Sequence, residues 1–275
     1  MTKEQIDIEF NNFRGELTSF LFRLATNKEL AEDITQDTYI KVVEKITSFK
    51  ELSSFKTWVF SIATNLAKNS LKKQNRWIVE AQDYGAMLHV KSQEHWKAFQ
   101  QIFNSTPEQE YSVKEHLVYC FNCMNKTLQI EQQICLWLKE VYDFKISEII
   151  VITELSEGKV KHAIANARKT LGEIFEKRCA IVSQNGVCNQ CSELTGLLNP
   201  KQKAQEKVNE MKLAKRKNTE SMEKLFDIRL EMVKSFDPLN SNNTLVTTYF
   251  LENSEKWVEE GKMKKVLVNP SESKS

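Results

Sequence analysis

Apolar residues recur at helical spacing over most of the chain. Three such patterns within residues 5–76 each give one apolar stripe on a polar helix. The stripes are Leu17, Phe20, Leu21 and Leu24; then Leu30, Ile34, Val42, Val43 and Ile46; then Phe55, Val59, Ile62 and Leu66. The third helix is expected to start after Ser53 or Ser54, since either hydroxyl can cap it. Together the stripes predict a helical bundle.

A second set of helical patterns begins near residue 115, beyond a stretch over 77–112 that contains the turn-like "NSTPEQE". The stripe there consists of Ile130, Ile134, Leu138 and Val141, and "ISEIIVIT" and "SEGKVKHAIANARKTLGEIF" follow closely. Three closely spaced helices, the last one basic and starting at the cap residue Ser156, are typical of a helix-turn-helix. We therefore predict a linker over 77–112 and a helix-turn-helix domain over 113–178.

Residues 179–275 form a cysteine-containing, highly charged region. Within 201–236 an apolar stripe predicts one more helix, which Asp237-Pro238 should end. The stripe is Met222, Leu225, Phe226, Leu230 and Val233. The predicted fold class is therefore all-α: an N-terminal helical bundle, a linker, a C-terminal helix-turn-helix domain and a helical extension.

Composition supports this prediction and adds a cellular context. The 275 residues include only 7 Gly and 4 Pro, and a net charge of +2 does not indicate a partner by itself. No apolar run approaches the length of a membrane span, and the first residues lack the apolar core of a signal peptide. We expect no membrane insertion and a cytoplasmic location, where the 6 cysteines would stay reduced.

The last helix of the helix-turn-helix has one apolar and one polar face. The polar side and its N-terminal turn supply cations and hydrogen-bonding groups that suit the phosphates and base edges of duplex DNA. The candidate DNA-reading residues are Lys159, Lys161, His162, Ala165, Asn166, Arg168 and Lys169. A solvated cationic face is the alternative, and the spacing of the three helices favours DNA.

Two surfaces of the first domain are candidates for binding. An acidic, hydrogen-bonding strip lies opposite the apolar stripe of its helix and suits another protein, although a solvated acidic face has the same pattern. Its members are Asp33, Gln36, Asp37 and Glu44. The second surface mixes aromatic and basic residues, as is needed to stack unpaired bases. Its members are Phe55, Trp58, Phe60, Asn65, Lys68, Asn69, Lys72 and Lys73; Phe55 also has the spacing of a core residue.

Three segments in order resemble a known family. "AEDITQDTYIKVV" at 31–43, "SSFKTWVFSIATNLAKNSLKK" at 53–73 and "SEIIVITELSEGKVKHAIANARKTL" at 147–171 are similar to regions 2.2, 2.3 to 2.4, and 4.2 of extracytoplasmic-function (ECF) sigma factors. Lys159 and Ile150 depart from the family pattern, which commonly has Thr in "GTV" and Ala in "EIA". The first departure adds a cation near the DNA, and the second is a packing change.

The resemblance implies a non-enzymatic transcription initiation factor that binds core RNA polymerase. It implies that the acidic strip docks on the β′ clamp helices, that region 4 meets the β flap, and that an anti-sigma factor is a further candidate partner. The aromatic surface and the loop "TSFKELSS" before it would then recognise and open the promoter −10 element, and the basic helix would read the −35 element. The alternatives are a helix-turn-helix regulator that acts without polymerase and, ranked below it, a thiol-disulfide enzyme.

Two Cys-x-x-Cys pairs flank the predicted helix-turn-helix: Cys120 with Cys123, and Cys188 with Cys191. Four thiolates are a common ligand set for structural zinc, and a shared ion would clasp the two ends of the domain. The long separation of the pairs is unlike a compact zinc ribbon, so core cysteines and a thiol sensor remain as alternatives.

The zinc hypothesis predicts about one zinc ion per chain in protein purified without chelator. Replacing Cys188 and Cys191 with Ser should release the ion, because two of its four ligands are removed. Metal analysis checks both statements, with Cys135→Ala as the control variant for a cysteine predicted to lie in the core. Zinc retained after the double substitution would contradict the clasp.

Overall fold

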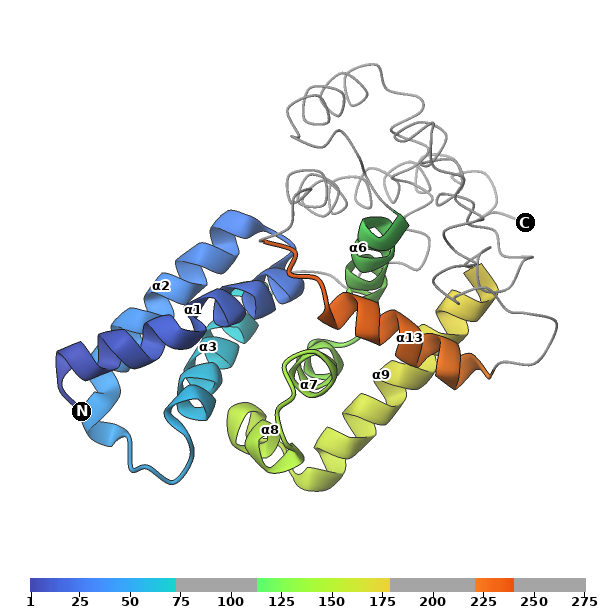
Figure 1. The fold of residues 1–275 in the computed structure, drawn as a ribbon. Helices are drawn as coiled ribbons and strands as arrows, with labels where there is room; N and C mark the ends of the chain where they lie inside the picture. The colour runs from blue at the N-terminus through green and yellow to red at the C-terminus, as the bar shows by residue number, and fades with distance from the viewer. Residues whose placement is uncertain (73–112, 179–220, 240–275) are drawn as a thin grey trace, which may run out of the picture.

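The computed structural model describes residues 1–72, 113–178 and 221–239, and every regular element in these ranges is helical. In chain order they are α1 (Lys3–Ala25), α2 (Lys28–Lys45), the 3-10 turn η1 (Ile46–Ser48), α3 (Phe55–Leu71), α6 (Val113–Asn125), α7 (Ile130–Glu140), α8 (Ile146–Thr153), α9 (Glu157–Arg178) and α13 (Met222–Lys234). Figure 1 shows α1, α2 and α3 as one group, with α6 to α9 beside it and α13 lying across α9. The all-α prediction is confirmed for the described residues.

The first group begins with a tight antiparallel pair of helices. Thr2 and Gln5 form a capping box at the start of α1, and the helix ends at Thr26 in the left-handed region (φ 57°). The Thr26 N–H donates to the Phe22 carbonyl at 2.7 Å, and the Asn27 side chain then accepts from Leu30 N at 2.7 Å. The C-cap of α1 is therefore followed directly by the N-cap of α2, and this tight connection turns α2 back along α1.

The third helix starts at the second of the two serines that the sequence offers. Ser54 Oγ accepts from Thr57 N at 3.1 Å, so Ser54 is the N-cap of α3. The predicted apolar stripes then meet in one core, with Leu17, Ile34 and Val59 buried. Phe55, Ile62 and Leu66 are half-buried at the edge of this core.

The predicted helix-turn-helix is present as α7, α8 and α9. Lys145 N donates to Glu148 Oε2 at 2.9 Å at the start of α8, which ends at Glu154 in the left-handed region (φ 58°). After a short turn α9 begins directly beyond Ser156, as predicted. Its apolar face, including Val160 and Leu171, is buried against the neighbouring helices.

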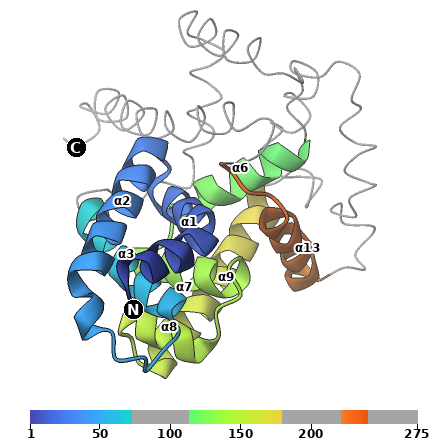
Figure 2. The same ribbon diagram turned by 60° about the vertical axis from the view of Figure 1, so that its left-hand side comes forward.

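The two helix groups, predicted as separate domains, share one core where α3 packs against α8. The ring of Phe60 lies 4.8 Å from the ring of Phe144, centroid to centroid, and 5.5 Å from that of Phe20. Thr57 Oγ1 donates to Glu148 Oε1 at 3.1 Å across the same boundary. Figure 2 shows α3 and α8 side by side from a second direction.

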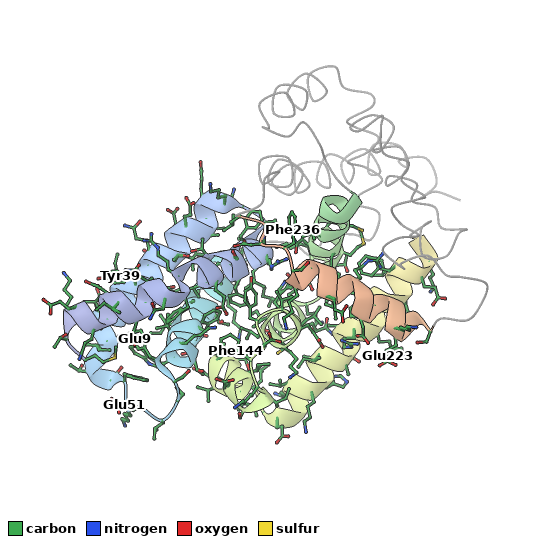
Figure 3. All side chains as sticks on the ribbon, viewed as in Figure 1. Glu9, Tyr39, Glu51, Phe144, Glu223 and Phe236 are labelled. Atoms are coloured by element: carbon green, nitrogen blue, oxygen red, sulfur yellow. The ribbon has the colours of Figure 1, made fainter. Side chains whose placement is uncertain are left out.

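A buried cation also joins the groups. Arg23 of α1 is 2% exposed, and its guanidinium donates to four acceptors. They are Tyr142 Oη at 3.2 Å, Asn122 Oδ1 at 3.2 Å, the Val233 carbonyl at 3.1 Å and the Phe236 carbonyl at 2.7 Å. The guanidinium carbon lies 5.0 Å from the centre of the Trp137 ring. Figure 3 places the labelled Phe236 where the end of α13 approaches α1.

Replacing Arg23 with Met should lower the free energy of unfolding by about 3 kcal/mol, because several buried acceptors would lose their donor at once. Urea denaturation followed by circular dichroism measures this change. Arg14→Met is the matched control, since Arg14 is an exposed arginine on the same helix. Equal unfolding midpoints for the two variants would contradict the central role of Arg23.

Candidate nucleic-acid interface

The helix α9 presents most of its predicted DNA-reading residues to solvent. Lys159, Lys161, His162, Ala165 and Lys169 are exposed. Asn166 is half-buried, and its Nδ2 lies 3.3 Å from His162 Nε2. Lys161 Nζ pairs with Glu157 Oε1 at 2.6 Å, and this hydrogen bond lowers the pKa of the Glu157 carboxyl. Such an exposed pair is weak and would yield readily to a DNA phosphate.

Arg168 differs from the other predicted DNA contacts because its charge is already paired. Its Nη1 donates to Glu140 Oε1 at 3.0 Å and its Nη2 to Asp227 of α13. Burial acts to lower the pKa of Arg168, but the hydrogen bonds and charges of the two carboxylates outweigh it and raise the pKa. As the structure stands, Arg168 is occupied by protein groups, and the prediction that it contacts DNA does not fit this arrangement.

The C-terminal half of α3 provides the polar part of the second predicted surface. Asn65, Asn69 and Lys72 are exposed and Lys68 is half-buried, whereas Lys73 lies outside the described residues. Lys68, Asn69 and Lys72 line an open pocket of about 470 Å³ together with Lys126 and Gln129 from the second helix group. Leu71, Leu128, Ile130 and Glu131 also line this pocket, so its lining is mixed, and Lys68 and Lys72 are the cations there that suit the backbone of a nucleic-acid strand.

The aromatic part of that surface is smaller than predicted. Phe60 is 0% exposed, so the prediction that its ring meets DNA bases is wrong; the ring instead fills the core between the two helix groups. Phe55 and Trp58 are half-buried, and the Trp58 ring lies 5.0 Å from the ring of Phe49. The loop after Phe49 adds Leu52, which is 89% exposed. Phe49 and Leu52 both lie in the loop "TSFKELSS" at 47–54, which the family resemblance assigns to the −10 element together with the aromatic surface.

All four residues of the acidic strip are exposed on α2, opposite the buried Ile34 and Val42. The members are Asp33, Gln36, Asp37 and Glu44. Glu44 Oε2 accepts from Lys41 Nζ at 2.7 Å, and that hydrogen bond raises the pKa of Lys41. The strip is therefore accessible to a partner, and its binding role stays a prediction.

The cysteines predicted as zinc ligands are only partly within the described residues. Cys120 and Cys123 are buried on α6, whereas Cys188 and Cys191 lie outside the described ranges. Among the described residues, no group of three or more His, Cys, Asp or Glu side chains is arranged to hold a metal ion. Cys135 is a core residue as predicted, and burial raises the pKa of its thiol to about 11.

Across the ranges that the structure describes, no helix is both long and apolar enough to cross a membrane.

Comparison with known proteins identifies the helices that carry these surfaces. The family model for sigma-70 region 2 matches residues 10–77, which contain most of α1 and all of α2 and α3. A "Probable RNA polymerase sigma factor" of Haemophilus influenzae is 25% identical over 179 residues, covering 62% of this chain and 90% of the relative. Residues 10–77 thus match sigma-70 region 2, and the chain is similar to RNA polymerase sigma factors over 62% of its length.

Two further similar proteins extend this comparison. The "ECF RNA polymerase sigma factor SigX" of Bacillus subtilis is 26% identical over 177 residues, covering 63% of this chain and 85% of SigX. A solved complex of the sigma factor RpoE with the anti-sigma factor NepR from Bartonella quintana is 21% identical, with a TM-score of 0.42, over 63% of this chain and 98% of that one.

Replacing Trp58 with Ala should weaken binding to single-stranded DNA about tenfold, because stacking on one aromatic ring contributes about 1–3 kcal/mol. Fluorescence anisotropy with a labelled mixed-sequence oligonucleotide measures the affinity. Phe60→Leu serves as the control, since it should lower the melting temperature and leave the affinity of the folded protein unchanged. A larger loss of affinity for Phe60→Leu than for Trp58→Ala would contradict this assignment.

Proposed function

We propose that this sigma factor binds core RNA polymerase and directs it to the −10 and −35 elements of its promoters, with the first helix group opening the −10 element. The observation that carries the proposal is the match of residues 10–77 to sigma-70 region 2. The same residues expose both the acidic strip and the aromatic and basic surface of α3. The activity requires binding alone, and no catalytic group is assigned.

Polymerase docking is assigned to the acidic strip on α2. The carboxylates of Asp33, Asp37 and Glu44 and the amide of Gln36 project from one exposed helix face. A rigid row of anions and amides provides both charge attraction and directional hydrogen bonds to a helical partner surface. By the family resemblance, that partner is the clamp-helix region of β′, while the helix-turn-helix meets the β flap.

Promoter opening is assigned to α3 and the loop before it. Phe49, Phe55 and Trp58 form an aromatic cluster that reaches the surface, with centroid distances of 5.0–6.0 Å between neighbouring rings. Separating a base from its stack costs a few kcal/mol, which stacking on these rings can offset without nucleotide hydrolysis. Lys68 and Lys72 lie at the far end of the same helix, where they can hold the phosphates of the opened strand.

Reading of the −35 element is assigned to α9. Its exposed face carries Lys159, Lys161, His162, Ala165 and Lys169, with Asn166 at the margin. The cations attract the phosphates, while the Asn166 amide can pair with a base edge in the major groove. The Lys159 departure adds a cation to the N-terminal turn, which inserts first in helix-turn-helix complexes.

Replacing Asp37 with Lys should reduce affinity for sigma-free core RNA polymerase about tenfold or more, because it places a cation within the strip assigned to docking. Pull-down with purified core polymerase measures binding, and transcription from a library of genomic promoter fragments measures function.

Glu9→Lys is the matched control, because it makes the same charge change at an exposed position on the neighbouring helix α1. Equal binding of the two variants would show that the docking surface lies outside the acidic strip. Absence of promoter-dependent transcripts with the unaltered protein would exclude the sigma function itself and favour a helix-turn-helix regulator that acts alone.

A further inference from the structure

The segment 221–239 of the extension packs on the second helix group. Ser221 caps α13 by accepting from Lys224 N at 3.2 Å, and Phe226, Leu230 and Val233 are buried against that group. The Phe226 ring lies 5.8 Å from the ring of Phe121 in α6 and 6.5 Å from that of Phe175 in α9, centroid to centroid. Figure 1 shows α13 lying across α9, with α6 next to its other end. The segment is therefore an integral part of the folded arrangement.

On one side, α13 contacts the helix assigned to the −35 element. Asp227 pairs with Arg168, whose guanidinium carbon also lies 5.1 Å from the centre of the Phe226 ring. A pocket of about 330 Å³ between the two helices is lined by residues of both, including Lys169 and Glu223. Figure 3 shows the labelled Glu223 at the end of α13 that lies over α9. Carboxylates of α13 thus lie beside two cations predicted to contact DNA, Arg168 and Lys169.

On the other side, the end of the segment is bonded to the first helix group. Ser19 Oγ donates to Asp237 Oδ1 at 2.6 Å, and Arg23 of the same helix donates to the Phe236 carbonyl at 2.7 Å. Lys234 Nζ pairs with Asp143 at 2.5 Å in the turn between α7 and α8. One short segment therefore binds α1, α9 and the α7–α8 turn at the same time.

From these contacts we infer that residues 221–239 are an internal inhibitor of DNA binding, which rests on the proposed role of α9 in reading DNA. Asp227 takes the place of a DNA phosphate at Arg168, and the bonds to Ser19 and Arg23 hold the two helix groups in contact. Opening the segment releases Nη2 of Arg168, while Nη1 keeps its bond to Glu140, and it permits the groups to separate onto two promoter elements. Asp227 is 53% exposed, and Lys234 and Asp143 are 44% and 67% exposed, so breaking these two ion pairs costs little energy.

The test compares Asp227→Lys with Glu231→Lys in the full chain. Both variants make the same charge change on α13, and Glu231 is exposed one turn beyond Asp227. Hydrogen–deuterium exchange of peptides covering 221–239 reports opening, and anisotropy with a labelled 30-base-pair mixed-sequence duplex at several salt concentrations reports DNA binding. Where Asp227→Lys lowers the yield of folded protein, Asp227→Asn is compared with Glu231→Gln.

The inference predicts that Asp227→Lys exchanges faster over 221–239 and binds the duplex about tenfold more tightly than Glu231→Lys. Equal DNA affinities of these two variants, with duplex binding by the unaltered protein, would overturn the inhibitor and leave the proposed function standing. Failure of every protein, the unaltered chain included, to bind duplex DNA at any salt concentration would overturn the inhibitor together with the DNA-reading role of α9.

Discussion

Arg23 is a permanent cation placed in the interior, and its hydration has to be replaced completely for the protein to fold. Four acceptors and one aromatic face do this, and they come from α6, α7, the α7–α8 turn and the end of α13. Because the acceptors come from three distant parts of the chain, the guanidinium is satisfied only when all of these parts are in place. The shared core of the two helix groups depends on this condition.

The aromatic contact between the two helix groups also depends on residues that are far apart in the sequence. The Lys56 ammonium lies 5.2 Å from the centre of the Phe144 ring and pairs with Glu16 at 2.6 Å. Lys126 reaches from the second group to the carbonyl of Leu24 at 2.6 Å, which places a cation at the C-terminal end of α1. Polar groups of one helix group thus complete the interior and helix ends of the other.

The sequence was sufficient for features set by local patterns. Ser54 was one of two predicted caps because a hydroxyl before an apolar stripe has a defined role, and the buried Val160 and Leu171 followed from spacing on one helix. The acidic residues of α2 were expected to be exposed for the same reason. The described helices accordingly lie close to where their apolar stripes predicted them.

The features that the sequence did not predict are contacts between distant segments. Phe60 was assigned to DNA because it stands among lysines in sequence, but Phe144 from another domain covers it. Arg168 fits the polar face of α9, and nothing nearby in the chain indicates that Asp227 pairs with it. The burial of Arg23 was not predicted, because a single arginine next to apolar residues of a helix normally has its charged group in solvent. Such pairings depend on the tertiary arrangement, which cannot be predicted from the periodicity of apolar residues along the chain.

Because Arg23 lies near the start of the chain, it is synthesised well before some of its hydrogen-bond acceptors. A ribosome completes α1 to α9 before it has made Val233 and Phe236, which supply two of the four hydrogen-bond acceptors of Arg23. Since N-terminal parts fold first during synthesis, the growing chain passes through a stage in which both helix groups exist without their fastening segment. At that stage Arg23 lacks two of its four acceptors, so the shared core is complete only after residues 233–236 have been made.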